Sequence, residues 1–406
     1  MRILIVTARF YPEPFSITNM ALGLKELGHE VTVLTGVPNS GQWKVYDGYE
    51  GVKEEDFNGI HIIRVNEKIK KKGFVGLVTN YLSIYHQYRK KLKKMSCEYD
   101  VVFSHVMSPI HTIDYVGRYC KKYGIPHFHY GFDLWPESLV ATGYLKRKSF
   151  LFKSVKNYSK KRYSECDLIA FASPCAERYL KDYLGVKVPF KHIYQPCLTT
   201  KPSLDVVRKH GYDKEKKHIL FCGTIARFNH LSLFVEALSS FRDDFIFDIV
   251  GSGSDLPAVE ECVKKHHLED NVIFHGRVTS EQTKQFYFDA DILFVPLFWN
   301  SDTSNMIPQK LIEYFMYNRP IIGMLRGDGR DLLKKASSKN IISEQTVEEL
   351  KDSLNKLKAM SNVELEACGN ENRDFFDSHK EFTIQHVCKE IEKCLFDLVE
   401  SNKTKN

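Results

Sequence analysis

Residues 289–322 read DADILFVPLFWNSDTSNMIPQKLIEYFMYNRPII, and this stretch is the most informative part of the chain. It predicts a buried strand over Ile292–Pro296, a polar loop, and then a helix that carries Lys310 and Glu313. A tight turn and a second apolar strand, Ile321–Leu325, follow. Together these elements form one unit of a parallel sheet, and such sheets bind ligands at the carboxyl ends of their strands. The loop and the helix start therefore offer backbone N–H groups and a positive helix end to a phosphate. A solvated amphipathic helix with a chance Lys–Glu pair is equally consistent with this sequence.

The alternation of strands and helices extends through the rest of the chain. Further strands are predicted over Ile3–Thr7, His29–Thr35, Ile60–Val65, Val101–Ser104, Pro126–Tyr130, Leu168–Ala172, Ile219–Cys222, Phe245–Val250 and Val272–His275. Such alternation predicts doubly wound α/β sheets, and 406 residues are enough for two domains. Val188–Ser203 reads as a proline-bearing linker between them. We expect an amino-terminal acceptor-binding domain over 1–190, a nucleotide-sugar-binding domain over 191–375, and a final helix over 376–406 that returns toward the first domain and ends in a frayed tail.

Composition is that of an ordinary globular protein, with 43% hydrophobic and 27% charged residues. The start, MRILIVTARF, contains an apolar run of only Ile3–Val6, so no secretory signal is expected there. No stretch approaches the ~20 apolar residues that span a bilayer. The ten cysteines include no CxxC pair, which indicates neither a zinc site nor a disulfide framework. These features predict a cytoplasmic protein.

Charge is unevenly divided along the chain. Residues 1–190 hold 29 Lys and Arg against 18 Asp and Glu, a net charge of +11, whereas residues 191–406 hold 29 against 33, a net charge of −4. The excess lies in three clusters with apolar or aromatic neighbours, Lys68–Lys72, Arg89–Lys94 and Lys146–Arg162. A solvated helix face explains any single cluster. Three clusters in one half favour an anionic partner, and a membrane surface with a phosphorylated substrate is favoured over nucleic acid.

Several motifs match one known family in order and spacing. In the second half these are FCGT (221–224), VEAL (235–238), DIVGSGSDL (248–256), NVIFHGRV (271–278), DADILFVPL (289–297) and PQKLIEYFMYNRPII (308–322). In the first half they are FYPEPFSITNMALGLKELGHEVTVLTGVPN (10–39) and DLWPESL (133–139). Together they resemble the family 4 retaining glycosyltransferases, in particular the subgroup that builds bacterial surface polysaccharides. The resemblance covers nearly the whole chain and implies the GT-B fold, in which two Rossmann-like doubly wound α/β domains face each other across a cleft.

The resemblance implies a nucleotide-sugar site in the second domain. Members of the family carry two glutamates separated by seven residues, the first facing the donor sugar and the second the ribose hydroxyls. Glu313 matches the second glutamate, but the first position holds Asn305. Its amide can donate and accept hydrogen bonds to a sugar hydroxyl but carries no charge. The donor loops add Gly251, Gly253, Gly276 and Arg277 to the binding residues.

The cations that neutralise the donor diphosphate differ from the family pattern. The usual Arg and Lys after the first strand of the donor domain align with Thr224 and Asn229. Arg227 lies between these two positions, and Lys310 lies on the predicted helix that also carries Glu313. We therefore expect Arg227 and Lys310 to neutralise the diphosphate in place of the usual Arg and Lys. Thr224 is kept as a donor-binding candidate.

The first domain contributes two further catalytic candidates. A histidine that many members place before the DLWP-like block aligns with Phe132, which leaves Asp133 as the nearest polar group. His105 follows a predicted strand and is either structural or a hydrogen-bond partner for a sugar. Trp135, between Asp133 and Glu137, is suited to stacking on a sugar ring or packing against lipid. Catalytic residues are therefore expected to be Lys310, Arg227, Asp133 and His105.

The chemistry demands stabilisation of the departing diphosphate. The resemblance implies that cations and helix starts supply it without a metal or cofactor, and that attack occurs on the same face of the sugar while the leaving phosphate helps to take the acceptor proton. Asp289-Ala-Asp291 spells the DxD of metal-dependent glycosyltransferases, but it ends a helix and enters a buried strand, so we expect a structural role.

We therefore expect a hexosyl- or N-acetylhexosaminyl-type transferase that moves a sugar from a nucleotide sugar, UDP-linked by preference, to a lipid-linked saccharide. The product would be capsule, O-antigen (lipopolysaccharide) or exopolysaccharide, made by a cytoplasmic protein on the inner face of the cell membrane. Expected partners are the donor, the acceptor and an anionic membrane surface, without nucleic acid. Two alternatives stay open, a nucleotide-sugar epimerase of the same architecture and a catalytically inactive nucleotide-sugar binder. The PQKLIEYF and DLWPESL motifs favour the transferase over the epimerase.

Overall fold

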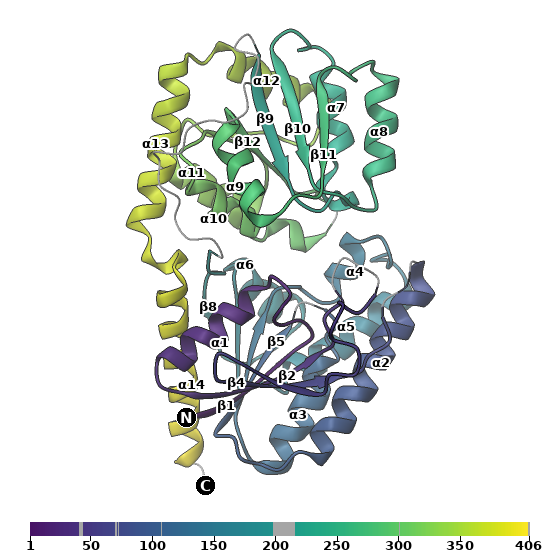
Figure 1. Ribbon diagram of the computed structural model, residues 1–406, viewed down its shortest axis with the longest axis vertical. Coiled ribbons are helices and arrows are strands. Elements are labelled where there is room, and N and C mark those ends of the chain that lie inside the picture. The colour runs from purple at the N-terminus through teal and green to yellow at the C-terminus, as the bar shows by residue number, and fades with distance from the viewer. Residues whose placement is uncertain are drawn as a thin grey trace. The chain divides into compact units, whose positions relative to one another are not determined.

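The computed structural model describes residues 1–39, 44–69, 71, 73–106, 108–197, 216–299 and 301–404. The chain forms two compact units. Unit 1 consists of Met1–Leu198 together with Glu381–Asn406, and unit 2 consists of Thr199–Lys380. Figure 1 labels most of the elements of both units.

Unit 1 is built on an eight-stranded sheet with the order β3-β4-β2-β1-β5-β6-β7-β8. Its strands are β1 (Arg2–Thr7), β2 (Glu30–Gly36), β3 (Glu54–Phe57), β4 (Ile60–Val65), β5 (Val101–Val106), β6 (His127–Gly131), β7 (Leu168–Phe171) and β8 (Phe190–His192). Its helices are α1 (Ser16–Glu26), α2 (Gly73–Lys94), α3 (Thr112–Tyr123), α4 (Glu137–Ala141), α5 (Phe150–Tyr163), α6 (Cys175–Arg178) and α14 (Ile384–Lys403). All strand pairs are parallel except β3–β4, because a short turn joins those two strands.

Both faces of this sheet are covered, which explains why its central strands are continuous apolar runs. Ile3 and Ile5 of β1 face α1 and the carboxyl-terminal helix α14. Leu4 and Val6 point the other way, toward α2 and α3. Chain termini far apart in sequence thus pack together, since Cys388 of α14 lies against α1.

Unit 2 is built on a six-stranded parallel sheet with the order β11-β10-β9-β12-β13-β14. Its strands are β9 (Lys217–Cys222), β10 (Phe245–Val250), β11 (Val272–Gly276), β12 (Ile292–Pro296), β13 (Ile321–Met324) and β14 (Ile341–Ile342). Its helices are α7 (Leu231–Leu238), α8 (Leu256–Lys265), α9 (Ser280–Asp289), α10 (Gln309–Phe315), α11 (Gly327–Ala336), α12 (Val347–Ala359) and α13 (Asn362–Ser378). Short 3-10 turns, η2 (Arg227–Asn229) and η3 (Asp302–Asn305), precede α7 and α10.

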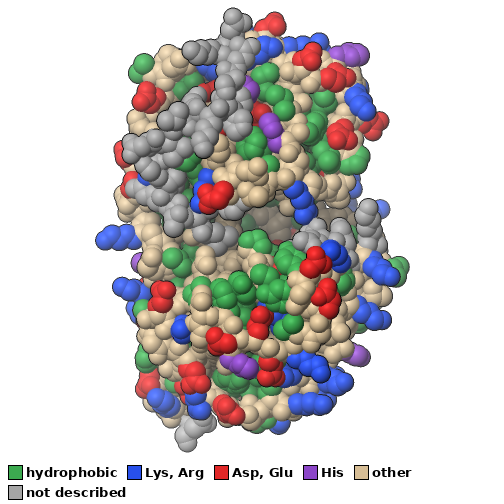
Figure 2. All heavy atoms as spheres, in the orientation of Figure 1, with side chains coloured by type: hydrophobic (Ala, Val, Ile, Leu, Met, Phe, Trp, Pro, Cys, Tyr) green, Lys and Arg blue, Asp and Glu red, His purple; other side chains and the backbone are tan. Residues whose placement is uncertain are grey.

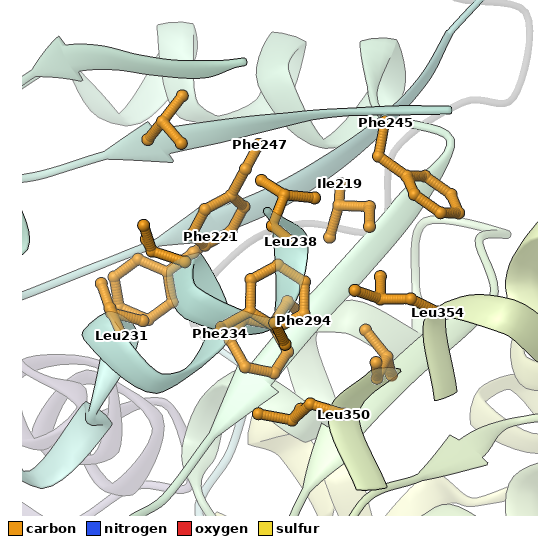
Figure 3. Close-up of a cluster of buried hydrophobic side chains, with 14 of the residues drawn as sticks. Ile219, Phe221, Leu231, Phe234, Leu238, Phe245, Phe247, Phe294, Leu350 and Leu354 are labelled. Atoms are coloured by element: carbon orange, nitrogen blue, oxygen red, sulfur yellow. The ribbon is translucent and has the colours of Figure 1, made fainter. Parts of the chain in front are cut away.

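The core of unit 2 fills the space between the sheet and the helices α7, α8 and α12 (Figure 3). Phe234 of α7 lies at its centre. Its ring is 4.7 Å from that of Phe247 on β10 and 4.3 Å from that of Phe294 on β12. Leu350 and Leu354 of α12 close the cluster from the helix side. This packing holds the central strands, and therefore the loops at their ends, in fixed positions.

The predicted α/β class with two parallel sheets is confirmed, and one local prediction is wrong. The sequence predicts a linker over residues 188–203, but Phe190–His192 form β8 and pair with β7. The strand is short and lies at the sheet edge, where the flanking prolines cost no ladder hydrogen bond. Unit 1 therefore continues past residue 190, and residues 198–203 of the expected linker lie outside the described residues. Among the helices of the described ranges, none is long and apolar enough to cross a membrane.

Candidate active site

The sheet of unit 2 reverses its strand order between β9 and β12, and such a switch point is where doubly wound sheets bind ligands. The loop after β9 runs from residue 223 to 230, and the loop after β12 runs from 297 to 308. The N–H of Phe298 donates a 2.7 Å hydrogen bond to the carbonyl of Phe228, and the His230 and Phe298 rings lie 4.5 Å apart. The two loops therefore form one connected surface at the switch point.

Lys310 lies at this switch point in the first turn of α10. A Cβ added to Gly223 would collide with its ammonium, which is also 5.0 Å from the centre of the Phe221 ring. Burial lowers the pKa of Lys310, whereas the nearby Cys222 thiol and Glu313 carboxyl act to raise it. The structure thus brings Lys310 and Glu313 together at the end of β9. A half-buried cation attracts an anion more strongly than one in water does.

Glycines allow the loops after β9, β10 and β11 to meet backbone to backbone. Gly223 (φ +152°) donates to the carbonyl of Val250 at 2.8 Å, and Gly251 (φ +135°) donates to that of Gly276 at 2.7 Å. A Cβ at Gly251 would overlap the carbonyl of Gly223, and one at Gly253 would overlap another carbonyl of the same loop. The sequence predicts that Gly251 and Gly253 let a ligand approach the backbone. In the structure each of them is required for the approach of a neighbouring loop.

Two arginines lie on the exposed part of this edge. Arg227 is exposed in η2 after β9, and Arg277 is exposed after β11, where its Nε donates a 2.6 Å hydrogen bond to Ser252. Thr224 is exposed in the loop after β9. Asn229 is buried, and its side-chain oxygen accepts a 3.1 Å hydrogen bond from a backbone N–H three residues earlier. Asn229 therefore shapes the turn, while Arg227 and Thr224 present their side chains outward.

The loop after β12 is fixed by the start of α11. Asn305, the last residue of η3, lies so close to Gly327 that a Cβ there would be 2.8 Å from Asn305 Cβ. Arg326 donates a 2.8 Å hydrogen bond to the carbonyl of Ser301, and its guanidinium lies 5.8 Å from the centre of the Trp299 ring. These contacts place Asn305 and Arg326 on the same edge of the sheet as Lys310.

Unit 1 has its own group of polar side chains at the carboxyl edge of its sheet. Ser108, after β5, donates a 2.7 Å hydrogen bond to Asp133, after β6, and accepts one of 3.1 Å from Trp135 Nε1. Burial raises the pKa of Asp133 to about 6, although the hydrogen bond from Ser108 acts to lower it. Asp133 is therefore a carboxyl group that changes charge close to neutral pH, where a general base is most effective.

Aromatic rings surround this carboxyl group. The Trp135 ring lies 6.1 Å from that of Tyr81 on α2, which lies 5.8 Å from the ring of His111. The expectation that Trp135 stacks on a sugar or on lipid is not met, because only 5% of this residue is exposed. Its indole N–H is used to hold Ser108, which explains why a large aromatic residue is buried at this edge.

His105 lies within β5 rather than after it. Its Nδ1 is 3.4 Å from the Thr7 hydroxyl and its ring is 4.8 Å from that of Phe132. Burial lowers the pKa of His105 to about 3, so the imidazole is neutral at pH 7. Because the residue is buried in this arrangement, its geometry supports a packing role.

The DxD residues lie at the amino end of β12, the opposite end from the loops above. Asp289 accepts a 2.9 Å hydrogen bond from Gln285 Nε2, and Asp291 accepts one of 2.8 Å from the N–H of His218. Both bonds fix the entry into the strand, as expected for a structural role. Within the parts of the chain that the structure describes, no three His, Cys, Asp or Glu side chains are grouped to hold a metal ion.

Sequence reasoning missed Ser108, Tyr81 and Arg326. A signal for two of them was present, since Ser108 and Arg326 closely follow strands β5 and β13, and the carboxyl ends of parallel strands share one edge. No sequence signal points to Tyr81, because it reaches Trp135 only after α2 has packed against the sheet.

Two family models match the chain. The family described as Glycosyltransferase Family 4 matches residues 15–196, and that described as Glycosyl transferases group 1 matches residues 205–375. Together they account for most of both units. The chain therefore belongs to the family 4 glycosyltransferases and is a glycosyltransferase. The epimerase alternative is set aside.

Similar proteins agree with this assignment. An uncharacterised glycosyltransferase of Methanocaldococcus jannaschii is 22% identical over 312 residues, which cover 73% of this chain and 74% of the relative. Among solved structures, sucrose-phosphate synthase from Thermosynechococcus elongatus superimposes with a TM-score of 0.75 at 13% identity, over 99% of this chain and all of the other. WaaG, a glycosyltransferase involved in lipopolysaccharide biosynthesis, gives 0.71 at 14% identity over 98% and 99%. Anabaena HepE in complex with UDP and glucose gives 0.67 at 10% identity over 98% and 100%. At these identities the structures show the fold, and the predicted GT-B class is confirmed.

Proposed function

We propose that this glycosyltransferase moves a sugar, with retention of configuration, from a UDP-sugar to a lipid-linked saccharide during the synthesis of a surface polysaccharide. The observation that carries the proposal is the Lys310 ammonium, held half-buried under Gly223 beside Glu313 at the switch point of unit 2. Support for the donor comes from HepE, which was solved with UDP and glucose. Support for the pathway comes from WaaG, which acts in lipopolysaccharide biosynthesis.

In the proposed donor complex, cations neutralise the diphosphate. Lys310 contacts it from below the loop after β9, and Arg227 reaches it from the exposed side of the same loop. Such preorganised charges stabilise the leaving group as the glycosidic bond breaks. Glu313 accepts hydrogen bonds from the ribose hydroxyls, and the amide of Asn305 binds a hydroxyl of the sugar. We propose that no metal or cofactor takes part.

In the proposed acceptor complex, the Asp133 carboxylate accepts a hydrogen bond from a neighbouring hydroxyl of the acceptor sugar and so positions the acceptor. As the attacking hydroxyl oxygen bonds to the donor sugar and the sugar–phosphate bond breaks, the hydrogen of the attacking hydroxyl moves to the leaving phosphate. The hydrogen bond from Ser108 favours the charged form of Asp133 and fixes one of its oxygens, which leaves the other for the acceptor. Asp133 is thus the residue of unit 1 on which activity depends most.

The proposed acceptor is anchored in a membrane, so the protein works at the cytoplasmic inner face of the cell membrane. The charge division supports this location, because residues 1–190 carry a net charge of +11. Each Lys or Arg near an anionic surface contributes about 1 kcal/mol. Binding of this kind is electrostatic and weakens as salt is added.

The test is an assay with a panel of radiolabelled nucleotide sugars, cell membranes as the source of acceptor, and purified protein. We expect label from one UDP-sugar to enter the lipid fraction, and Asp133→Asn to abolish the transfer while leaving UDP binding intact. If the protein binds UDP but neither transfers nor hydrolyses any donor, it is an inactive nucleotide-sugar binder and the proposal is wrong.

A further inference from the structure

Exposed apolar side chains are concentrated on one part of unit 1. Among the described residues, eleven large hydrophobic side chains are exposed, and eight of them lie between residues 75 and 183. The most exposed of these eight are Phe150, at 87%, and Val75, at 74%. We call the following six residues the apolar edge: Val75, Val78 and Leu82 of α2, Tyr144, and Phe150 and Leu151 of α5. An exposed apolar cluster of this kind marks a contact surface for a partner.

The exposed faces of α2 and α5 share one distribution of apolar and basic residues. On α2 the exposed stripe begins with Val75, Val78 and Leu82 and continues one turn later with His86 and Lys90. On α5 the exposed residues begin with Phe150 and Leu151 and continue with Lys153, Lys160 and Lys161. Each helix is therefore apolar at its first turns and basic toward its end.

Both helices begin at the carboxyl edge of the sheet, since each leads from the end of one strand to the start of the next. They are on the same side of the sheet, where α3 packs against both. Tyr81 of α2 contacts Trp135 in the segment that leads to α5. The two apolar helix starts thus lie at the same edge as Asp133, the proposed acceptor-binding residue.

The two segments that carry the apolar edge are basic. Residues 68–97 and 138–164 contain no Asp or Glu. Lys68 and Lys71 are exposed just before α2, and Lys146 and Lys148 are exposed just before α5. Figure 2 shows Lys and Arg side chains along the side of unit 1 where Figure 1 places α2. An apolar surface bordered by cations complements an anionic bilayer, whose acyl chains take up the apolar groups and whose phosphates meet the lysines.

We infer that the apolar edge inserts into an anionic phospholipid bilayer and holds unit 1 with Asp133 at the membrane surface. The apolar edge is formed by the first turns of α2 and α5, so each helix enters the bilayer by its start and not along its side. Lys153 follows Phe150 by three residues, a rise of about 4.5 Å along the helix. When Phe150 lies among the acyl chains, Lys153 is therefore nearer to the phosphates. The inference deepens the proposed function, on which the role of Asp133 depends, but membrane binding itself is measured without any substrate.

The test compares wild type with the double variant Phe150→Ser/Leu151→Ser on vesicles of phosphatidylglycerol and phosphatidylcholine in equal parts. Sedimentation should show at least a tenfold weaker partition for the variant, a loss of about 1.4 kcal/mol. In roughly 1 M salt the Debye length falls to about 3 Å, so the electrostatic part of binding is suppressed. Wild type should keep a residual affinity there that the variant lacks. Val363→Ser removes an equally exposed apolar side chain from unit 2 and should change nothing.

Insertion is read directly from a tryptophan placed in the apolar edge. With vesicles, Phe150→Trp should show blue-shifted fluorescence that brominated acyl chains quench, whereas Val363→Trp should not. Equal partition of wild type and double variant, or a Phe150→Trp fluorescence signal that brominated lipid leaves unchanged, would overturn the inference even if donor binding is normal. Normal insertion with no UDP binding would instead leave the inference intact and remove the proposed function.

Discussion

Replacing Lys310 by methionine keeps most of the bulk of the side chain and removes its charge. At about 4 Å and an effective dielectric constant of about 20, an ammonium attracts one phosphate charge by about 4 kcal/mol. Water and counterions reduce that value, and hydrogen bonds to charged groups contribute about 1.5–3 kcal/mol net. Lys310→Met should therefore weaken UDP binding roughly ten- to a hundred-fold. Isothermal titration calorimetry with UDP measures the effect.

The same variant should be no less stable than wild type. Burial lowers the pKa of Lys310 from its ordinary value of 10.5, so the charged form is disfavoured in the folded state. That cost is fully present at pH 7, and it is lost as the pH rises toward 10.5. Lys310→Met removes the cost, and its melting temperature at pH 7 should equal or exceed that of wild type. Lys264→Met, an exposed lysine at the far end of α8, is the matched control and should change neither property.

Gly223→Ala perturbs the position of the Lys310 ammonium without removing its charge. The added Cβ would displace Lys310 Nζ, so Gly223→Ala should weaken UDP binding about as much as Lys310→Met does. Because Gly223 also has a φ of +152°, which L side chains rarely adopt, the variant should in addition melt at a lower temperature than Lys310→Met. The double variant should bind no worse than Lys310→Met alone, because both changes act on one interaction. If Lys310→Met binds UDP normally and melts at a lower temperature, the lysine is a structural residue and the donor site has been misplaced.

Four other outcomes follow from the site and the core. Glu313→Ala should weaken UDP binding roughly ten- to a hundred-fold and Glu313→Gln less, with unchanged melting; calorimetry showing normal binding for Glu313→Ala would contradict its ribose contact. Transfer rates should rise as pH passes through 6, where Asp133 loses its proton. Ser108→Ala removes the hydrogen bond that lowers this pKa and should shift the rise to higher pH, and an unshifted profile would exclude that role. Phe234→Ala should lower the free energy of unfolding of unit 2 by about 3–5 kcal/mol in urea titrations, whereas a loss below about 1 kcal/mol would mean that the cavity collapses. Turnover should persist in excess chelator, and a loss that manganese or magnesium restores would count against metal-free catalysis.

Much of the fold follows from local sequence patterns. Central strands such as Ile292–Pro296 lie between two helix layers, so they are continuous apolar runs with a clear signal. The strand β3, Glu54–Phe57, has no such signal, because three of its four residues are acidic. It forms at the sheet edge, where Arg64 of β4 forms an ion pair with Glu55 and its Nε donates a 2.6 Å hydrogen bond to the Glu55 carboxylate. Such cross-strand partners are known only after the strands have paired.

Some contacts of the candidate site also follow from local sequence, whereas others depend on how the strands pair. Lys310 and Glu313 are three residues apart on one helix, so their proximity follows from helix geometry. The contact between Lys310 and Gly223 spans 87 positions and depends on β9 and β12 being neighbours. The Ser108–Asp133 bond likewise depends on the pairing of β5 with β6. The burial of His105 does not follow from the sequence. The apolar run that predicts β5 stops at Ser104, whereas β5 continues to pair with β6 as far as Val106.

The position of Lys310 is hard to explain by folding alone. Among the described residues no carboxylate lies within ion-pair distance of its ammonium, although Glu313 and the Cys222 thiol are near enough to raise its pKa. The centre of the Phe221 ring is 5.0 Å from the ammonium. A partly buried cation without a close anion destabilises the folded state, and natural proteins keep such a cost mainly where function requires it. The absence of a side chain at Gly223 leaves room for the Lys310 ammonium, because a Cβ at this position would displace the ammonium. A bound diphosphate would supply the missing negative charge, so donor binding should also raise the melting temperature of wild type more than that of Lys310→Met at equal UDP saturation. Equal stabilisation of both proteins would show that the charge of Lys310 is not what the diphosphate meets.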